Sequence, residues 1–221
     1  MKKKKESKKP WPTKDAMEQI YEMHLWGKNN SKFYSGIGSH DPKIVDPYIR
    51  IVSSFLNSFN PPMVVCDLGC GDFNVGKKLV KFSKKYIAVD IASNLINHNK
   101  EIFKNEKLEF QCLDIAKDDL PNGDCALIRQ VLQHLSNAEV LNITNKLKTY
   151  KYVIITEHVP DQVFIPNKEI ISGQGIRLKK QSGINLLAPP FNFKVKEKNE
   201  LLAVRLNNTE GVIITSLYTL F

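Results

Sequence analysis

Two acidic residues and a glycine turn mark the part of the chain best suited to hold a nucleoside. Asp67 ends an apolar run and is followed by Gly69 and Gly71, and Asp90 ends the next apolar run. Glycines let a ligand lie directly against backbone amides. A carboxylate about 20 residues past such glycines is at the separation expected for binding ribose hydroxyls. These residues therefore predict a site for a nucleoside-bearing cofactor.

The glycine turn differs from a dinucleotide fingerprint in two ways. The third glycine of Gly-x-Gly-x-x-Gly is replaced by Asn74, and the residue after Gly71 is Asp72. A carboxylate there would repel a pyrophosphate at the N-terminus of a helix. The turn therefore favours a cationic ligand over a dinucleotide.

The segment 67–71 resembles motif I of class I S-adenosylmethionine-dependent methyltransferases, whose cofactor carries a sulfonium and no phosphate. The segments 108–115 and 124–135 resemble the family's third strand and its fourth strand with the following active-site turn. The resemblance covers roughly residues 63–158. It implies that Asp114 holds the adenine amino group and that S-adenosylmethionine is the cofactor. The implied cofactor contacts are Asp67, Gly69, Cys70, Gly71, Asp90, Ile91, Asp114, Ile115, Arg129 and Gln130.

Methyl transfer needs alignment above all, and it needs a base only when the acceptor must lose a proton. His134 and His158 are the candidate bases, because histidine titrates near neutral pH and both follow predicted strand ends. Each has a structural alternative, as a histidine packed under the cofactor or as a loop residue. Glu157 is a candidate hydrogen-bond acceptor for the substrate.

The N-terminal stretch resembles the cap that precedes motif I in some small-molecule members of the family. Trp26 and Tyr34 are the aromatic side chains predicted to contact the substrate site and to screen the sulfonium by cation–π contact. The alternative is that both are ordinary core residues.

Strands and helices alternate from residue 64 to residue 157, which is typical of a parallel sheet covered on both faces. The predicted strands are 64–67, 86–90, 108–113, 125–129 and 152–157, and the predicted helices are 75–82, 94–103 and 137–147. Segments 191–195 and 212–217 predict a closing antiparallel pair. The expected fold is α/β, a Rossmann-like doubly wound sheet of seven strands with the last one antiparallel. Asp67, Asp90, Asp114, Arg129 and Glu157 should then lie at one edge of the sheet.

The chain divides into a tail, a cap and a core. Residues 1–15 form a basic tail expected to be disordered. Residues 16–60 form a helical cap with two predicted helices. The first covers residues 16–26, and the second begins after an N-cap at Asp46, with Pro47 at its first position. Residues 61–221 form the core, in which the polar segment at about 158–190 predicts a substrate loop, with a disordered insert as the alternative.

The net charge of +9 is concentrated in the tail, because residues 1–14 hold seven lysines and one glutamate. This indicates a solubilising leader or an arm for an anionic surface or nucleic acid. No Cys-x-x-Cys pair is present, so no metal site is predicted. No segment reads as a secretory signal or a membrane span, so a cytoplasmic location is expected.

The predicted function is methyl transfer to an oxygen or nitrogen atom of a small molecule. The segment 129–132 after the fourth strand lacks the Asn- or Asp-Pro-Pro-aromatic motif that stacks a flipped base, and Asn60-Pro61-Pro62-Met63 reads as a helix terminator. Alternatives are an RNA or protein methyltransferase that uses the lysine arm, an inactive cofactor-binding module and a nicotinamide enzyme. The sequence predicts no oligomeric state.

Overall fold

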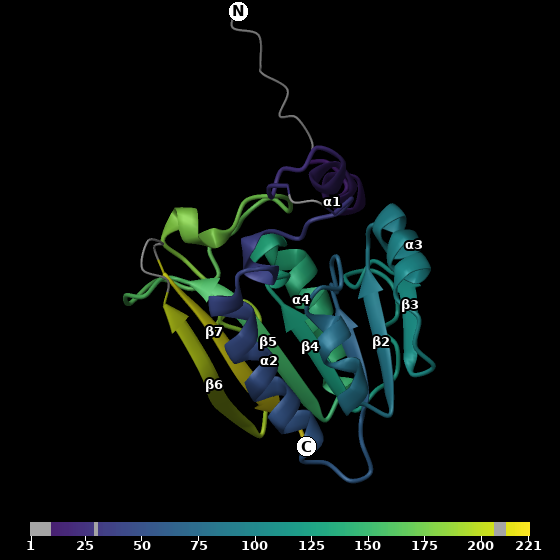
Figure 1. Ribbon diagram of the computed structural model, residues 1–221. Coiled ribbons are helices and arrows are strands. Elements are labelled where there is room, and N and C mark those ends of the chain that lie inside the picture. Colours follow the sequence, from purple (N-terminus) through teal and green to yellow (C-terminus); the bar gives the residue numbers. More distant parts are fainter. Residues whose placement is uncertain (1–9, 29–30, 206–210) are drawn as a thin grey trace, which may run out of the picture.

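A seven-stranded sheet forms the centre of the computed structural model, which describes residues 10–28, 31–205 and 211–221 (Figure 1). The strand order is β3-β2-β1-β4-β5-β7-β6, and β7 runs in the direction opposite to the other six strands. This confirms the predicted doubly wound sheet with an antiparallel last strand. The strands are β1 (Val64–Leu68), β2 (Lys85–Asp90), β3 (Leu108–Cys112), β4 (Cys125–Arg129), β5 (Tyr152–Val159), β6 (Glu197–Arg205) and β7 (Val212–Thr219).

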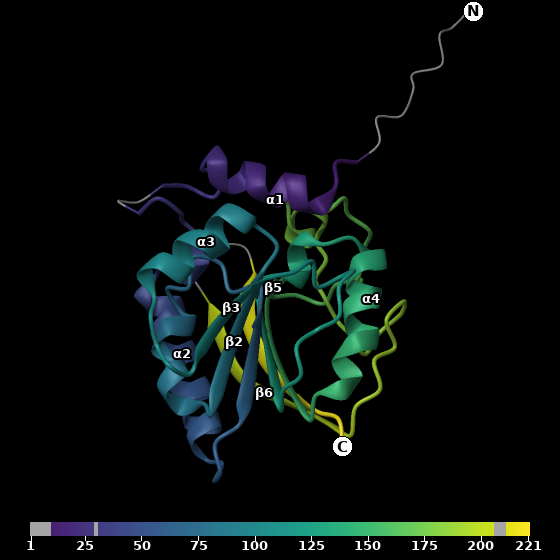
Figure 2. The ribbon, with the colours of Figure 1, turned by 90° about the vertical axis from the view of Figure 1, so that its right-hand side faces the viewer.

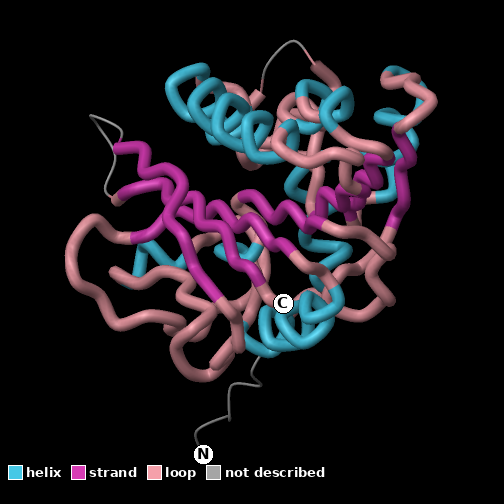
Figure 3. Tube along the Cα trace, turned by 90° about the horizontal axis from the view of Figure 1, so that it is seen from below, coloured by secondary structure: helices cyan, strands magenta, loops and turns pink. Residues whose placement is uncertain are grey.

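Helices cover both faces of the sheet, because the central parallel strands are apolar on both sides. Helices α2 (Pro42–Asn57) and α3 (Ser93–Ile102) lie on one side and α4 (Asn137–Lys146) on the other (Figure 2). Seen from below, the strands form one layer between the helices (Figure 3). Within β1, Val65 packs in the cluster that includes α2, whereas Cys66 and Leu68 pack in the cluster that includes α4.

Helix α1 (Thr13–Glu22) lies across the edge where the parallel strands end (Figures 1 and 2). Its buried residues are Met17 and Ile20, which pack in the cluster that includes α4, and Tyr21. The helix begins inside the segment predicted as a disordered tail, of which residues 1–9 lie outside the described residues. It also ends before Trp26, four residues earlier than predicted.

Two helix starts test the capping argument. Helix α4 begins with a capping box, because the Ser136 side chain accepts from the Glu139 backbone and the Glu139 side chain accepts from the Ser136 backbone. At α2 the predicted N-cap at Asp46 is wrong. The cap is Asp41, whose side chain accepts from the Lys43 N–H, and Pro47 lies inside the helix. Asp41-Pro42 repeats the same signature five residues earlier, so the helix starts at the first of two equivalent signals.

The predicted helix at 75–82 is replaced by two 3-10 turns, η2 (Gly76–Lys78) and η3 (Val80–Phe82). Phe73 is fully buried with a φ of 61°, and a Cβ at Gly76 would lie 2.4 Å from its ring. The buried ring therefore bends the chain where the first helical turn would run. Val75 and Val80 add little helix propensity to oppose this.

The strand predicted at 191–195 is also wrong. Phe191 and Phe193 alternate as a strand would and both are buried, but this segment is irregular and packs in the core cluster of α4. The sixth strand is instead β6, whose residues are mostly exposed and include the charged Glu197, Lys198, Glu200 and Arg205. It forms the edge of the sheet, where charged side chains are common because they discourage pairing with other chains.

Candidate active site

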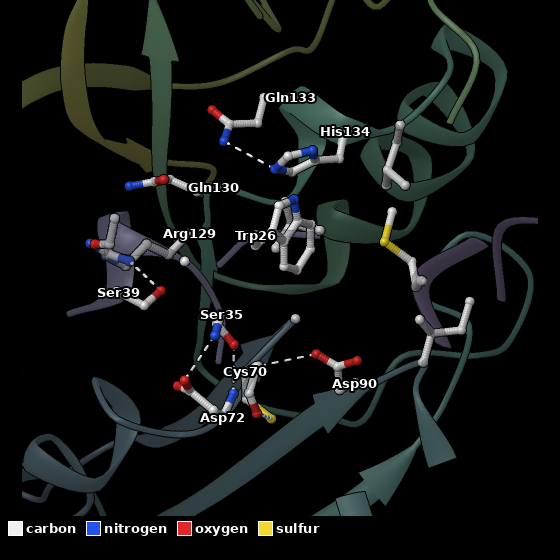
Figure 4. Close-up of a pocket in the computed structure, with 18 of the residues that line it drawn as sticks. Trp26, Ser35, Ser39, Cys70, Asp72, Asp90, Arg129, Gln130, Gln133 and His134 are labelled. Atoms are coloured by element: carbon white, nitrogen blue, oxygen red, sulfur yellow. Dashed lines mark hydrogen bonds between the residues drawn. The ribbon is translucent and has the colours of Figure 1, made fainter. Parts of the chain in front are cut away.

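A cavity of about 360 Å³ lies at the edge where the parallel strands end (Figure 4). Asp67, Asp90, Asp114 and Arg129 line it, as predicted for residues at consecutive strand ends. Side chains of α1, the segment 35–39 and the segment 174–179 line its other sides. The cavity therefore lies between the sheet and two irregular parts of the chain.

The glycine turn after β1 forms one wall of the cavity. Gly69 and Gly71 have φ angles of 92° and 57°, and a Cβ at either position would lie 2.3 Å from Val131 or 2.4 Å from Ser35. The backbone N–H groups of Gly69 and Cys70 donate to the Val89 carbonyl at 2.8 Å. Only glycine suits these two positions, so the turn keeps its backbone close to whatever fills the cavity.

Asp90 connects this turn to the end of β2. Its carboxylate accepts from the backbone N–H groups of Gly71 and Ala92, each at 3.0 Å. Burial raises its pKa, and these two hydrogen bonds oppose that shift. A carboxylate has about four lone-pair directions, so Asp90 can also accept hydrogen bonds from ligand hydroxyls.

Asp67 and Arg129 form a second polar group at the ends of β1 and β4. The Tyr86 hydroxyl donates to Asp67 at 2.9 Å, and burial raises the pKa of Asp67 to about 6. The Arg129 guanidinium lies over the Tyr48 ring at 5.0 Å and donates to the Ser39 hydroxyl at 3.3 Å and to the Gly38 carbonyl.

Two nitrogen atoms in the cavity wall are buried and have no hydrogen-bond partner among the described residues. They are Nε of Arg129 and Nε2 of Gln130. Gln130 also has a φ of 55°, which the chain adopts at the sharp turn after β4. Buried donors without acceptors are costly, so these two atoms suit a ligand that offers oxygen acceptors.

The segment 35–40 is held over the cavity by Asp72. The Ser35 N–H and His40 Nε2 lie 2.9 and 2.6 Å from the Asp72 carboxylate, and the Asp72 N–H donates to the Ser35 hydroxyl at 2.8 Å. The Asn74 side chain donates to the Ser39 carbonyl at 2.8 Å. Asp72 therefore has a positioning role that the sequence argument, which considered only its charge, did not identify.

The adenine side predicted from the sequence is an apolar slot with an acid at its end. Ile91 and Ile115 line it beside Asp114, together with Met17 of α1. One Asp114 oxygen accepts from the Ala116 N–H at 3.0 Å, and the other lies 2.9 Å from Lys117. Cys70 also lines the cavity, so all ten predicted cofactor residues lie together in its wall.

His134 lies in the cavity wall with both ring nitrogens occupied. Nδ1 donates to the Gly173 carbonyl at 3.1 Å, and Nε2 accepts from the Gln133 amide at 3.3 Å. Burial lowers its pKa to about 4. The ring is therefore neutral near pH 7 with its lone pair engaged, which does not favour the general-base role predicted for it.

Gln133 connects His134 to the end of β5. Its side-chain oxygen accepts from the His158 backbone N–H at 2.9 Å while its nitrogen donates to His134. His158 also lines the cavity, so its assignment as a candidate base stays a prediction. Gln133 is a site residue that the sequence argument missed, because an isolated glutamine carries no signal of its own.

The predicted substrate residues divide in the structure. Trp26 lines the cavity and packs on Tyr21 and His134, with ring centroids 5.4 and 5.1 Å away (Figure 4). Tyr34 does not line it and instead packs on His40 at 4.5 Å. Tyr21 of α1, which was not predicted, also lines the cavity, and its hydroxyl lies 3.0 Å from that of Ser35.

Glu157 lies under the cavity wall rather than in it. Its two oxygens accept from the backbone N–H groups of Leu132 and Gln133 at 3.0 and 2.9 Å. It is 4% exposed, and burial raises its pKa to about 8. Glu157 therefore holds the turn after β4 and does not line the cavity.

Comparison with known proteins identifies the fold and its chemistry. Residues 66–148 match the model of a family described as a methyltransferase domain. The chain carries a class I methyltransferase domain. Its cofactor is S-adenosylmethionine, and the matched residues include most of the cavity wall described above. No curated protein sequence matches the chain.

Solved structures extend the likeness in fold over nearly the whole chain. The N-methyltransferase NodS from Bradyrhizobium japonicum, in complex with S-adenosyl-L-homocysteine, is 11% identical with a TM-score of 0.65, covering 93% of this chain and 99% of that one. Human N-acetylserotonin methyltransferase in complex with S-adenosylmethionine is 15% identical with a TM-score of 0.60, covering 95% and 60%. The magnesium protoporphyrin IX methyltransferase of Synechocystis, with bound S-adenosylmethionine, is 13% identical with a TM-score of 0.56, covering 96% and 99%. At these identities the likeness shows the fold alone.

The described residues lack two further features. No cluster of three or more histidine, cysteine, aspartate or glutamate side chains within them could hold a metal ion. In the same residues no helix is both long and apolar enough to cross a membrane.

Proposed function

We propose that the chain transfers a methyl group from S-adenosylmethionine to an oxygen or nitrogen atom of a small organic molecule. The observation that carries this proposal is the cover over the cavity. Helix α1, the segment 35–40 and the segment 172–179 all lie over the edge where the strands end. A covered cavity suits an acceptor that can be enclosed rather than a polymer that must pass through.

Hydrogen bonds join these covering segments to one another. The Gln174 amide donates to the Leu25 carbonyl at 2.6 Å, which connects the segment 172–179 to the N-terminal region. The Glu139 carboxylate accepts from the hydroxyls of Thr13 and Ser172, on α1 and on the same irregular segment. A cover joined at several points supports the proposal that the acceptor is small.

S-adenosylmethionine supplies a methyl carbon on a positively charged sulfur, so the chain has to bind, orient and exclude water. We assign the ribose hydroxyls to Asp90, the adenine to Ile91, Asp114 and Ile115, and the methionine part to the glycine turn with Asp67, Arg129 and Gln130. The unpartnered Nε of Arg129 and Nε2 of Gln130 would donate to the methionine carboxylate. Trp26 is placed to cover the cofactor, and His158 is the candidate base where the acceptor must lose a proton.

A turnover assay tests the proposal. The formation of S-adenosylhomocysteine is measured with a pool of metabolites and, separately, with total RNA and with a protein extract. The full chain is compared with a chain that lacks residues 1–9, which keeps Thr13 and α1 intact. We expect turnover with the metabolite pool and no change on removal of the basic residues.

Two results would overturn this proposal. Turnover with RNA or protein alone, lost when residues 1–9 are removed, would identify a macromolecular acceptor bound through the lysine arm. Binding of S-adenosylhomocysteine without turnover in any pool would identify a cofactor-binding module.

A further inference from the structure

Lys179 lies apart from the charged side chains at the strand ends of the cavity. Five acids line it, namely Asp67, Asp72, Asp90, Asp114 and Glu139. Apart from its two histidines, the cations that line it within the described residues are Arg129 and Lys179. Lys179 lies at the end away from β2 and β3, because the short helix that carries it, η6 (Arg177–Lys180), packs beside β5.

None of the acids in the cavity or close to η6 forms an ion pair with Lys179, and most of them contact other groups. Asp72 lies 2.6 Å from His40, Asp114 lies 2.9 Å from Lys117, and Glu139 accepts from Thr13 and two serines. Glu157 and Glu169, the acids close to η6, accept from the backbone N–H groups of Leu132, Gln133, Asn137 and Ile170. The structure gives Lys179 no hydrogen bond or ion pair with any residue it describes.

Arg177 holds η6 rigidly against the active-site turn. Its guanidinium donates to the carbonyls of Lys168, Leu132 and Leu135 at 3.0, 3.0 and 2.7 Å, and to the Asn137 side chain at 2.7 Å. The side chain is 1% exposed. Four hydrogen bonds from one buried cation fix the position of a four-residue turn that has no regular structure on either side.

Lys179 of η6 and Ile176, the residue before η6, line the cavity, whereas Lys180 points elsewhere. The Lys180 ammonium donates to the Glu169 carbonyl at 2.7 Å, and Lys180 does not line the cavity. Ile176 lines the cavity, as do Trp26 and Ile37. Apolar side chains therefore line the cavity together with the exposed Lys179.

We propose that Lys179 recognises an acidic group, a carboxylate or a phosphate, on an otherwise apolar acceptor. The proposal rests on the proposed methyltransferase function and specifies its substrate class as a small organic anion. The charge of the cofactor works in the same direction, because an acceptor beside a sulfonium gains from carrying negative charge. Lys179 is a specificity residue here, and Arg177 is a positioning residue that acts through it.

The test compares matched anionic and neutral probes on protein saturated with S-adenosylhomocysteine. Benzoate, benzyl phosphate and the uncharged benzamide are titrated by ligand-observed NMR into wild type, Lys179→Gln and Lys180→Gln. We expect at least one anion to bind about fivefold more tightly than benzamide, as suits an ion pair at a solvent-accessible site. Lys179→Gln should abolish this preference and Lys180→Gln should keep it. The preferred anion then distinguishes a carboxylate from a phosphate.

Three results would overturn the inference: benzamide binding as tightly as both anions, a preference that survives Lys179→Gln, or no probe binding at all. Binding of S-adenosylhomocysteine is measured first in every variant. If wild type does not bind it, the proposed function itself fails. If all variants bind it equally and the anion preference is missing, only the assignment of Lys179 fails.

Discussion

The two ends of the cavity are built in different ways. The cofactor end consists of short turns at the tips of paired strands, where Asp90 and the glycine turn are held by hydrogen bonds to the adjacent backbone. The acceptor end consists of an irregular segment between β5 and β6, held by a few buried side chains such as Asn167 and Arg177. The first end depends on the fold, and the second depends on individual residues, so we expect them to respond differently to substitution.

Arg177→Met should give the largest effect and should act on the acceptor end alone. It removes four hydrogen bonds and leaves the buried carbonyls of Leu132 and Leu135, and Glu157, without their cation. Breaking a buried charged group in this way costs about 3 to 5 kcal/mol. The free energy of unfolding from urea titration should fall by that amount, and the melting temperature by about 6 to 20 °C.

The control for Arg177 is Arg205→Met, because the Arg205 guanidinium pairs with Asp161 on the exposed surface. It should change the melting temperature little. The affinity of Arg177→Met for S-adenosylhomocysteine, measured below its melting temperature, should stay within about threefold of wild type. A large loss of affinity would mean that the two ends form a single unit and that the comparison is wrong.

Gly69→Ala should affect the cofactor end. Its φ of 92° is unfavourable for alanine, and the added Cβ would lie 2.3 Å from Val131. Strain and overpacking of this kind cost about 2 to 4 kcal/mol. We expect this strain to be largest when the cofactor is bound. Calorimetry should then show that the affinity for S-adenosylhomocysteine is about 30- to 1000-fold lower.

Gly175→Ala is the matched control, because a Cβ at Gly175 would meet nothing within 4 Å. It lies in the irregular segment at the acceptor end and should leave cofactor affinity unchanged. Wild-type affinity in Gly69→Ala would show that the glycine turn is not the cofactor's binding wall.

The cofactor end could be predicted from the sequence, whereas most of the acceptor end could not. The strands at the cofactor end follow from apolar runs that end in an acid, and the observed bounds of β4 equal the predicted ones. The ten predicted cofactor residues line the cavity because strand ends in a parallel sheet meet at one edge. Local pattern is sufficient there, because each residue's place depends on its own strand.

The acceptor end is not predictable in this way, because its residues are placed by contacts between distant segments. Arg177 bonds to carbonyls more than 40 residues earlier in the chain, and Gln174 bonds to Leu25. Tyr34 and Tyr21 illustrate the limit, since both are aromatic residues of the cap and only the packing of α1 decides that Tyr21 reaches the cavity. Phe191 and Phe193 alternate with polar residues as in a strand, but both side chains are buried in an irregular segment.

His134 lies where the two ends meet, and its environment predicts how stability depends on pH. Burial lowers its folded-state pKa to about 4 from its ordinary value of 6.5. The unfolded chain therefore binds the proton more readily between these two values. The contribution of His134 to stability is fully present above pH 6.5 and is lost as the pH falls toward 4. Because of this group, the free energy of unfolding measured with urea should fall by about 1 to 2 kcal/mol between pH 7 and pH 5.

His134→Asn tests both this pH dependence and the role of the ring in catalysis. The free energy of unfolding of the variant should fall less between pH 7 and pH 5 than that of wild type. An NMR titration of the wild-type ring should show no protonation until well below pH 6. Turnover at pH 7 should fall by less than tenfold, because a neutral ring bonded to Gln133 and Gly173 orients the turn and removes no proton. A loss of 10²- to 10⁴-fold, as removal of a general base produces, would instead restore His134 to the catalytic role that its position after the fourth strand first suggested.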